Sequence, residues 1–266
     1  MKKFLITCLL ICAALPVKAQ NAPLVIEVFT HPGCAPLVID DYNADGSLKN
    51  PQDVDKKFNR RHVTSVFEDL IKEHPDAIAL HYFNDLGNHG HDEHGNDIPM
   101  KTVGEELGEF FNNRSYTYYG HDNFLNKHGN IQMIINSDFK TDGTMKHVVD
   151  LAIEQSTAEQ HIKPLIISKD ANALQVEWPE IVLEEPITPL LIGYKKTQNN
   201  EENRAPIALN PVNIVTDFKK LKSWNGDAKT QSVSIEDMDA DAFAIIAQSE
   251  RRYNARPLIY AAGKIE

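Results

Sequence analysis

The chain has 266 residues, of which 42% are hydrophobic, and a formal net charge of −11 at pH 7. A chain of this length can bury one large core or two ordinary ones, at about 100 to 200 residues per domain. The acidic balance argues against nucleic acid and anionic lipid as partners, because both require a basic protein face that releases counterions.

Residues 1–19 predict a secretory signal peptide. Lysines precede an apolar stretch from Phe4 to Val17, and small residues at its end predict cleavage after Ala19. The stretch contains Pro16 and is shorter than the roughly 20 residues of a membrane span. We therefore expect a periplasmic or secreted protein with no membrane span.

In the N-terminal half, buried-strand patterns alternate with helical ones. Continuous apolar runs predict strands at 24–29, 77–83 and 131–136. Apolar residues at helical spacing predict helices within 54–74, 102–113 and 147–156. A turn with a short edge strand is expected over 137–143. This alternation predicts crossover connections and an α/β domain over residues 22–162.

The pattern changes near residue 163, where short strand-like runs are separated by clusters of Asn, Asp, Gly and Pro. We expect strands at 165–168, 173–178, 189–196, 213–221, 230–235, 242–248 and 257–263. These runs fit an all-β, sandwich-like domain over residues 163–266. The period of 213–224 also leaves a helix there as an alternative.

Several segments resemble a known family. The stretches IEVFTHPGC, AIALHYFNDLG, IQMIIN, NIVTDFKKLKSWNG and AFAIIAQSERRYNARPLIYAAG occur in matching order over nearly the whole mature chain. Together they resemble the secreted bacterial family catalogued as domain of unknown function 1223. The resemblance implies a thioredoxin-like N-terminal domain followed by a β-rich C-terminal domain. It implies little about activity, because the family has no settled one.

Two positions depart from the family's pattern. The family commonly has a second cysteine three positions after the first, where this chain has Leu37, and a proline before the third strand, where it has Ile131. Because Cys8 and Cys12 lie in the predicted signal peptide, the mature chain keeps one thiol, Cys34. Thiol–disulfide exchange usually needs a resolving thiol, so we predict no dithiol chemistry. A monothiol redox reaction at Cys34 is the enzymatic alternative.

A calcium-loop pattern follows the first predicted strand. Asp41, Asn43 and Asp45 alternate before a glycine, and Ser47 would add its backbone carbonyl. The twelfth position is a glutamine instead of the usual glutamate, so Asp53, one residue later, would have to close the site. The alternative is an ordinary capping turn that binds no ion.

A second candidate metal site lies after the second predicted strand. His89, His91 and His94 stand beside acidic residues, a combination that suits zinc or copper. His81 and His121 would be the nearest further ligands. The alternative is a solvated loop.

The sequence contains no nucleophile-elbow, zinc-protease or phosphate-loop motif, so a hydrolase is unsupported. The leading hypothesis is a secreted or periplasmic thioredoxin-fold protein without a CxxC dithiol. It would act as a binding or accessory protein for an unidentified protein or small-molecule ligand. The alternatives are a monothiol redox protein acting through Cys34 and a secreted protein that binds calcium or a transition metal.

Overall fold

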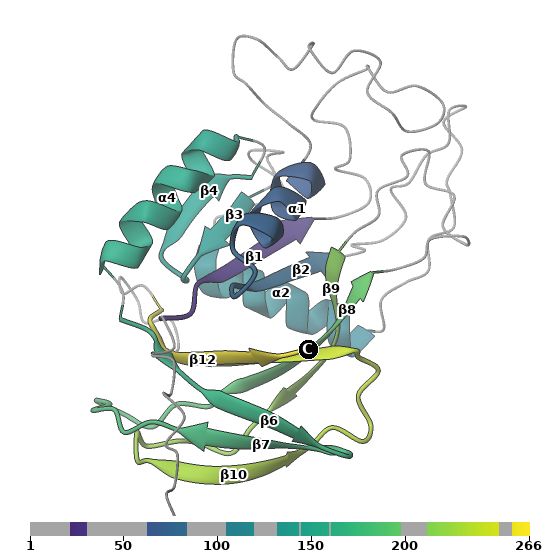
Figure 1. Ribbon diagram of the computed structural model, residues 1–266, viewed down its shortest axis with the longest axis vertical. Coiled ribbons are helices and arrows are strands. Elements are labelled where there is room, and N and C mark those ends of the chain that lie inside the picture. Colours follow the sequence, from purple (N-terminus) through teal and green to yellow (C-terminus); the bar gives the residue numbers. More distant parts are fainter. Residues whose placement is uncertain are drawn as a thin grey trace, which may run out of the picture.

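Figure 1 shows the computed structural model of the chain. The structure describes residues 22–30, 63–83, 105–119, 132–143, 145–159, 161–197, 212–249 and 257–266. The N-terminal half contributes β1 (Val25–Thr30), α1 (Val63–Glu73), β2 (Ile78–Phe83), α2 (Glu105–Tyr119), β3 (Gln132–Ile135), β4 (Phe139–Asp142) and α4 (Lys146–Glu159). The C-terminal half contributes β5 (Lys163–Pro164), β6 (Ile166–Asp170), β7 (Ala173–Trp178), β8 (Leu190–Thr197), β9 (Val212–Lys220), β10 (Lys229–Ser234), β11 (Ala242–Gln248) and β12 (Ile259–Ile265).

The described residues form one large mixed sheet and one small sheet. The large sheet has nine strands in the order β4-β3-β1-β2-β9-β8-β11-β12-β5, and the small sheet has three in the order β10-β7-β6. β1 pairs in parallel with β2 and antiparallel with β3. β2 also pairs in parallel with β9, which belongs to the C-terminal half. Strands from both halves of the chain therefore belong to the same sheet.

This arrangement shows that the predicted fold class is wrong. The sequence predicted an α/β thioredoxin-like domain followed by a separate all-β, sandwich-like domain. The structure instead has a nine-stranded sheet that crosses from one half to the other. The error has a physical cause: an apolar run shows that a strand is buried on both faces, but not which strand pairs with its edge. Pairing with β9 satisfies backbone groups at an edge of β2 that would otherwise be unpaired.

Most local predictions are confirmed by the structure. The three buried runs of the N-terminal half form β1, β2 and β3, and the expected short edge strand is β4. The alternative helix at 213–224 is wrong, because this stretch contains β9. α2 continues to Tyr119, beyond the predicted end at residue 113. Residues 54–62 of the first predicted helix lie outside the described part.

Side chains alternate across the large sheet and fill cores on both of its faces. On β1, Val25 faces a core that α2 covers, whereas Ile26 faces a core that α1 and α4 cover. Figure 1 shows α1 and α4 together beside the N-terminal strands. A third core lies between the large and the small sheet and contains both tryptophans, Trp178 and Trp224. The α2 core includes residues of β8, β11 and β12 as well as of β1 and β2, so it spans both halves of the chain.

The turn between β3 and β4 ties several elements together. Asn136 and Ser137 have positive φ angles of 49° and 63°, which a type I′ turn requires at its central residues. The Asn136 side chain accepts a hydrogen bond from the Val25 amide (2.8 Å) and donates one to the Ser156 hydroxyl. The Ser137 hydroxyl donates to the carbonyl of Pro257 (2.7 Å). The turn thus anchors the start of β1, helix α4 and the chain before β12.

We expect Asn136→Ala to lower the free energy of unfolding by about 2–3 kcal/mol. Two buried hydrogen bonds are lost at about 1 kcal/mol each, and alanine is less tolerant of a left-handed backbone. Chemical denaturation of the purified variant measures the loss. Asn136→Asp, which keeps an acceptor for the Val25 amide, should lose less than the alanine variant. Equal losses for the two variants would contradict the role given to that acceptor.

Candidate functional site

Three strands of the large sheet end or begin side by side. Thr30, the last residue of β1, lies opposite Phe83, the last residue of β2. Gln132, the first residue of β3, lies opposite Phe29. We call this place, defined by Thr30, Phe83 and Gln132, the β1–β2 edge. In α/β sheets, ligands bind outside the carboxyl ends of parallel strands, and β1 and β2 are such a pair.

The segments that carry most of the predicted site residues are attached at the β1–β2 edge. Segments 31–62 and 84–104 follow β1 and β2, and segment 120–131 precedes β3. The predicted site residues on these segments lie outside the described part: Cys34, Asp41, Asn43, Asp45, Ser47, Asp53, His89, His91, His94 and His121. Leu37 and Ile131 lie outside it as well. The monothiol, calcium and transition-metal sites therefore stay predictions.

His81 is a predicted ligand that the structure does describe. It lies on β2 with 2% of its surface exposed, and its ring meets that of Phe67 edge-on, with centroids 5.8 Å apart. Phe67 belongs to α1, so the imidazole sits in the core beneath that helix. Among the described residues, no group of three or more His, Cys, Asp or Glu side chains is placed to hold a metal ion.

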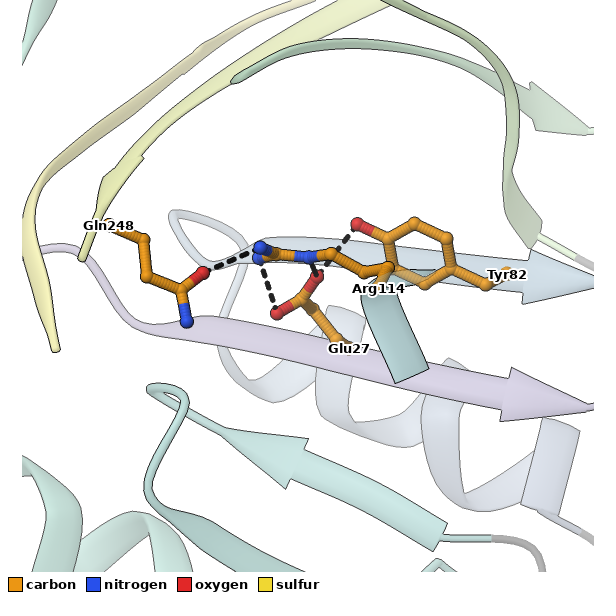
Figure 2. A network of polar contacts seen from close by, with 4 residues as sticks. All are labelled: Glu27, Tyr82, Arg114 and Gln248. Carbon is orange, nitrogen blue, oxygen red and sulfur yellow. Dashed lines mark hydrogen bonds and ion pairs between the residues drawn. The ribbon is translucent and has the colours of Figure 1, made fainter. Parts of the chain in front are cut away.

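A buried polar network lies beneath α2 and was not predicted from the sequence (Figure 2). Arg114 of α2 donates from Nε and Nη2 to the two carboxylate oxygens of Glu27 on β1, both at 2.9 Å. Tyr82 of β2 donates its hydroxyl to the same carboxylate at 2.7 Å. The Nη1 atom of Arg114 donates to the side-chain oxygen of Gln248 on β11 at 2.6 Å. The network thus joins a helix to three strands of the large sheet.

The two charges of this network are almost fully removed from water. Glu27 is 0% exposed and Arg114 is 4% exposed. Removing such ions from water costs several kcal/mol each, and only close, well-oriented partners offset that cost. The bidentate Arg–carboxylate geometry supplies such partners, and the Tyr82 hydroxyl adds a third donor to Glu27.

One sequence signal could have indicated this network. Glu27 is the charged residue within the apolar run LVIEVF, and a carboxylate in a strand buried on both faces needs a partner. The identity of the partner is not readable from the sequence, because Arg114 is 87 positions away.

An open, charged cavity of about 440 Å³ lies between α1 and α4. It is lined by Glu73, His74, Lys146, Asp150, Ile153 and Glu154. Lys146 contacts the carboxylates of Glu73 (2.7 Å) and Asp150. Burial lowers the pKa of Lys146, but its hydrogen bonds to Asp150 and Glu73 outweigh burial and raise that pKa above its usual value. Because both carboxylates are about half exposed, solvent weakens these pairs.

Glu266 forms a second surface cluster, and its titration gives a pH prediction. Its carboxylate lies 2.7 Å from the ammonium groups of both Lys196 and Lys264. Burial raises the pKa of Glu266, but the two lysines outweigh it, so the pKa is lowered from 4.5. A lowered pKa in the folded state stabilises the fold above the unfolded-state pKa, and the contribution disappears as the pH falls through the folded-state pKa.

We therefore expect Glu266→Gln to be less stable than the unsubstituted protein at pH 7, but not at a pH well below 4.5. The pairs are partly exposed, so the difference at pH 7 should be about 0.5 kcal/mol and should shrink in high salt. Denaturant titrations at both pH values measure it. An equal difference at the two pH values would show that the charge of Glu266 is not its cause.

Comparisons with known proteins place the fold among solved structures. Protein AGR_C_4864 from Agrobacterium tumefaciens is similar with a TM-score of 0.58 at 16% identity, over 93% of this chain and 96% of that one. HBP35 of Porphyromonas gingivalis is similar with a TM-score of 0.51 at 11% identity, over 92% of this chain and 75% of that one. At these identities the likeness concerns the fold alone. No family model matches the sequence, and no curated protein matches it.

Within the described ranges, no helix has the length and apolar character that crossing a membrane requires.

Proposed function

We propose that this protein is a secreted or periplasmic binding or accessory protein without dithiol chemistry, which binds its ligand at the β1–β2 edge. The observation that carries the proposal is the register that sets Thr30 opposite Phe83 and Gln132 opposite Phe29. This register attaches the segments with Cys34, the calcium-loop pattern and the histidines at neighbouring positions. Polar segments that leave a rigid sheet together are a common way to build a binding site.

Buried side chains next to the β1–β2 edge support the proposal, because they fix its position. The rings of Phe29 and Tyr82 stack with centroids 4.6 Å apart and planes 8° apart. The hydroxyl of Tyr82 is held by Glu27, which Arg114 holds in turn. Binding sites supported on rigid elements are more accurately positioned than sites on loops alone.

The predicted signal peptide of residues 1–19 supports the location outside the cytoplasm. The same proposal includes a relationship to the family called domain of unknown function 1223, which the chain resembles in the five segments quoted above. The lack of a resolving thiol at Leu37 supports a binding role over dithiol exchange.

An activity assay separates this proposal from the enzymatic alternative. Reduction of insulin disulfides by the mature protein in the presence of dithiothreitol should not exceed that of a Cys34→Ser variant. The monothiol alternative requires a reactive thiolate, so alkylation of Cys34 across a range of pH values would reveal a lowered pKa. Turnover that is well above background and lost in Cys34→Ser would replace the binding proposal with the redox one.

Calcium is the ligand that the pattern of Asp41, Asn43 and Asp45, in the segment after β1, favours. Extracellular calcium sites need only modest affinity, with dissociation constants of about 0.1–1 mM. At a calcium concentration about a hundred times the dissociation constant, binding should add roughly 2.7 kcal/mol of stability. We expect a matching rise in the melting temperature of the unsubstituted protein and none in Asp45→Ala. No calcium-dependent rise, or an equal rise in both proteins, would leave residues 41–53 as a capping turn.

A further inference from the structure

The two halves of the large sheet meet at a narrow contact between β2 and β9. Among the described residues, β2 and β9 share one register pair, His81 with Ile214. By contrast, six pairs join β1 to β2 and seven join β8 to β9. The Asn213 side chain adds one hydrogen bond to the carbonyl of Ala79, at 3.0 Å. We call this contact, defined by His81 and Ile214, the seam.

Helix α2 contacts both sides of the seam through neighbouring residues. Phe110 stacks on Phe218 of β9, with ring centroids 3.8 Å apart and planes 5° apart. Phe111 meets Tyr82 of β2 edge-on, with centroids 5.3 Å apart. Phe110 also lies near Tyr82, with ring centroids 6.2 Å apart, so these two consecutive residues of α2 contact both sides of the seam.

Arg114, one turn further along α2, repeats this bridging with polar contacts. Its guanidinium binds Glu27 of β1 on one side and Gln248 of β11 on the other, as Figure 2 shows. The core beneath α2 also contains side chains from both sides. Side chains under α2 therefore add to the single backbone pair at the seam.

Outside α2, the Ser137 hydroxyl donates to the Pro257 carbonyl and the Lys264 ammonium to the Pro75 carbonyl, both at 2.7 Å, so these contacts also join the two sides.

We propose that the seam is a hinge and that α2 is its latch. The opening of lowest free energy in the described part separates β4-β3-β1-β2 from β9-β8-β11-β12-β5, and the side chain of Arg114 holds the two groups together. Native proteins open locally and sub-globally at free energies that range up to that of global unfolding, in cooperative units that often coincide with supersecondary motifs. The hinge does not depend on which ligand the β1–β2 edge binds.

Hydrogen exchange of the mature protein, followed by NMR, tests the hinge without any substitution. The amides that face the seam in 78–82 and 212–215 should exchange at least about 10-fold faster than the paired amides of β11 and β12. Equal protection of the two sets would show that the sheet opens only as one unit and would overturn the proposal.

A variant then tests the latch. Removing one partner of a buried ion pair is strongly destabilising, so in Arg114→Met the seam amides should lose about 100-fold in protection. The paired amides of β11 and β12 should also lose protection, because they exchange through global unfolding, which this substitution makes easier. Leu174→Ala, which empties core volume beside the small sheet, is the matched control, because it destabilises the protein away from the seam.

Gln248→Met supplies a second variant, because it removes the contact of Arg114 across the seam and keeps the pair with Glu27. It should accelerate exchange at the seam by about 10-fold, the effect of a charged hydrogen bond. Faster exchange of the seam amides in Arg114→Met and Gln248→Met, and no change of the seam amides in Leu174→Ala, supports the latch. A seam that is unchanged in the two variants, or that accelerates to the same extent in Leu174→Ala, contradicts it.

Discussion

Replacing Arg114 by methionine should lower the free energy of unfolding by about 3–5 kcal/mol. Methionine keeps much of the apolar volume of the arginine stem but removes both donors to Glu27. The carboxylate would then stay buried with only part of its partners. Denaturant unfolding, monitored by circular dichroism, measures the loss.

A double-mutant cycle with Glu27 distinguishes the ion pair from simple loss of packing. Glu27→Gln removes the charge and keeps an oxygen that can accept from the Tyr82 hydroxyl. The double variant should therefore be at least about 1 kcal/mol more stable than the sum of the two single losses predicts. Additive losses would mean that Arg114 and Glu27 act independently, against the bidentate contact seen between them.

Trp224→Ala should cause a loss of similar size, about 3–5 kcal/mol. Trp224 is 0% exposed and lies between the two sheets, with its ring centroid 4.9 Å from that of Trp178. Its indole Nε1 donates to the carbonyl of Asp227 at 2.8 Å. Alanine at this position would leave a cavity that the two sheets cannot close without moving.

Two further substitutions control this measurement. Trp224→Phe keeps an aromatic ring and should lose less than Trp224→Ala, while Lys222→Ala, at an exposed position nearby, should stay within about 0.5 kcal/mol of the unsubstituted protein. A loss in Trp224→Ala as small as that in Lys222→Ala would show that the third core does not hold the two sheets together.

The sequence predicts the strands well because their signal is local. The apolar run at 77–83 indicates that β2 is covered on both faces, and in the structure consecutive side chains of β2 are indeed buried. It carries no information about the partner at the edge of β2, so the pairing with β9, more than a hundred positions away, was missed. Without that pairing, the sequence suggests two domains where the structure has one sheet shared by both halves.

The polar network beneath α2 could be predicted only in part for a related reason. A lone carboxylate in a buried run, Glu27, implies that a buried partner exists. Arg114 is one of several polar residues on α2, and which of them faces the sheet depends on how the helix is docked. The sequence patterns around Cys34 and the histidines indicate chemistry, but they carry no distances between the groups that would perform it.

The pairing of His81 with Ile214 is the contact on which the shared sheet, the seam and the latch all depend. Nuclear Overhauser effects between backbone protons around these two residues, measured on the isotopically labelled protein, test it most directly. We predict cross-strand signals in the pattern of a parallel pair, together with contacts from Phe110 to Phe218 and from Phe111 to Tyr82. Signals confined within each half of the chain, with none between β2 and β9, would contradict the single shared sheet.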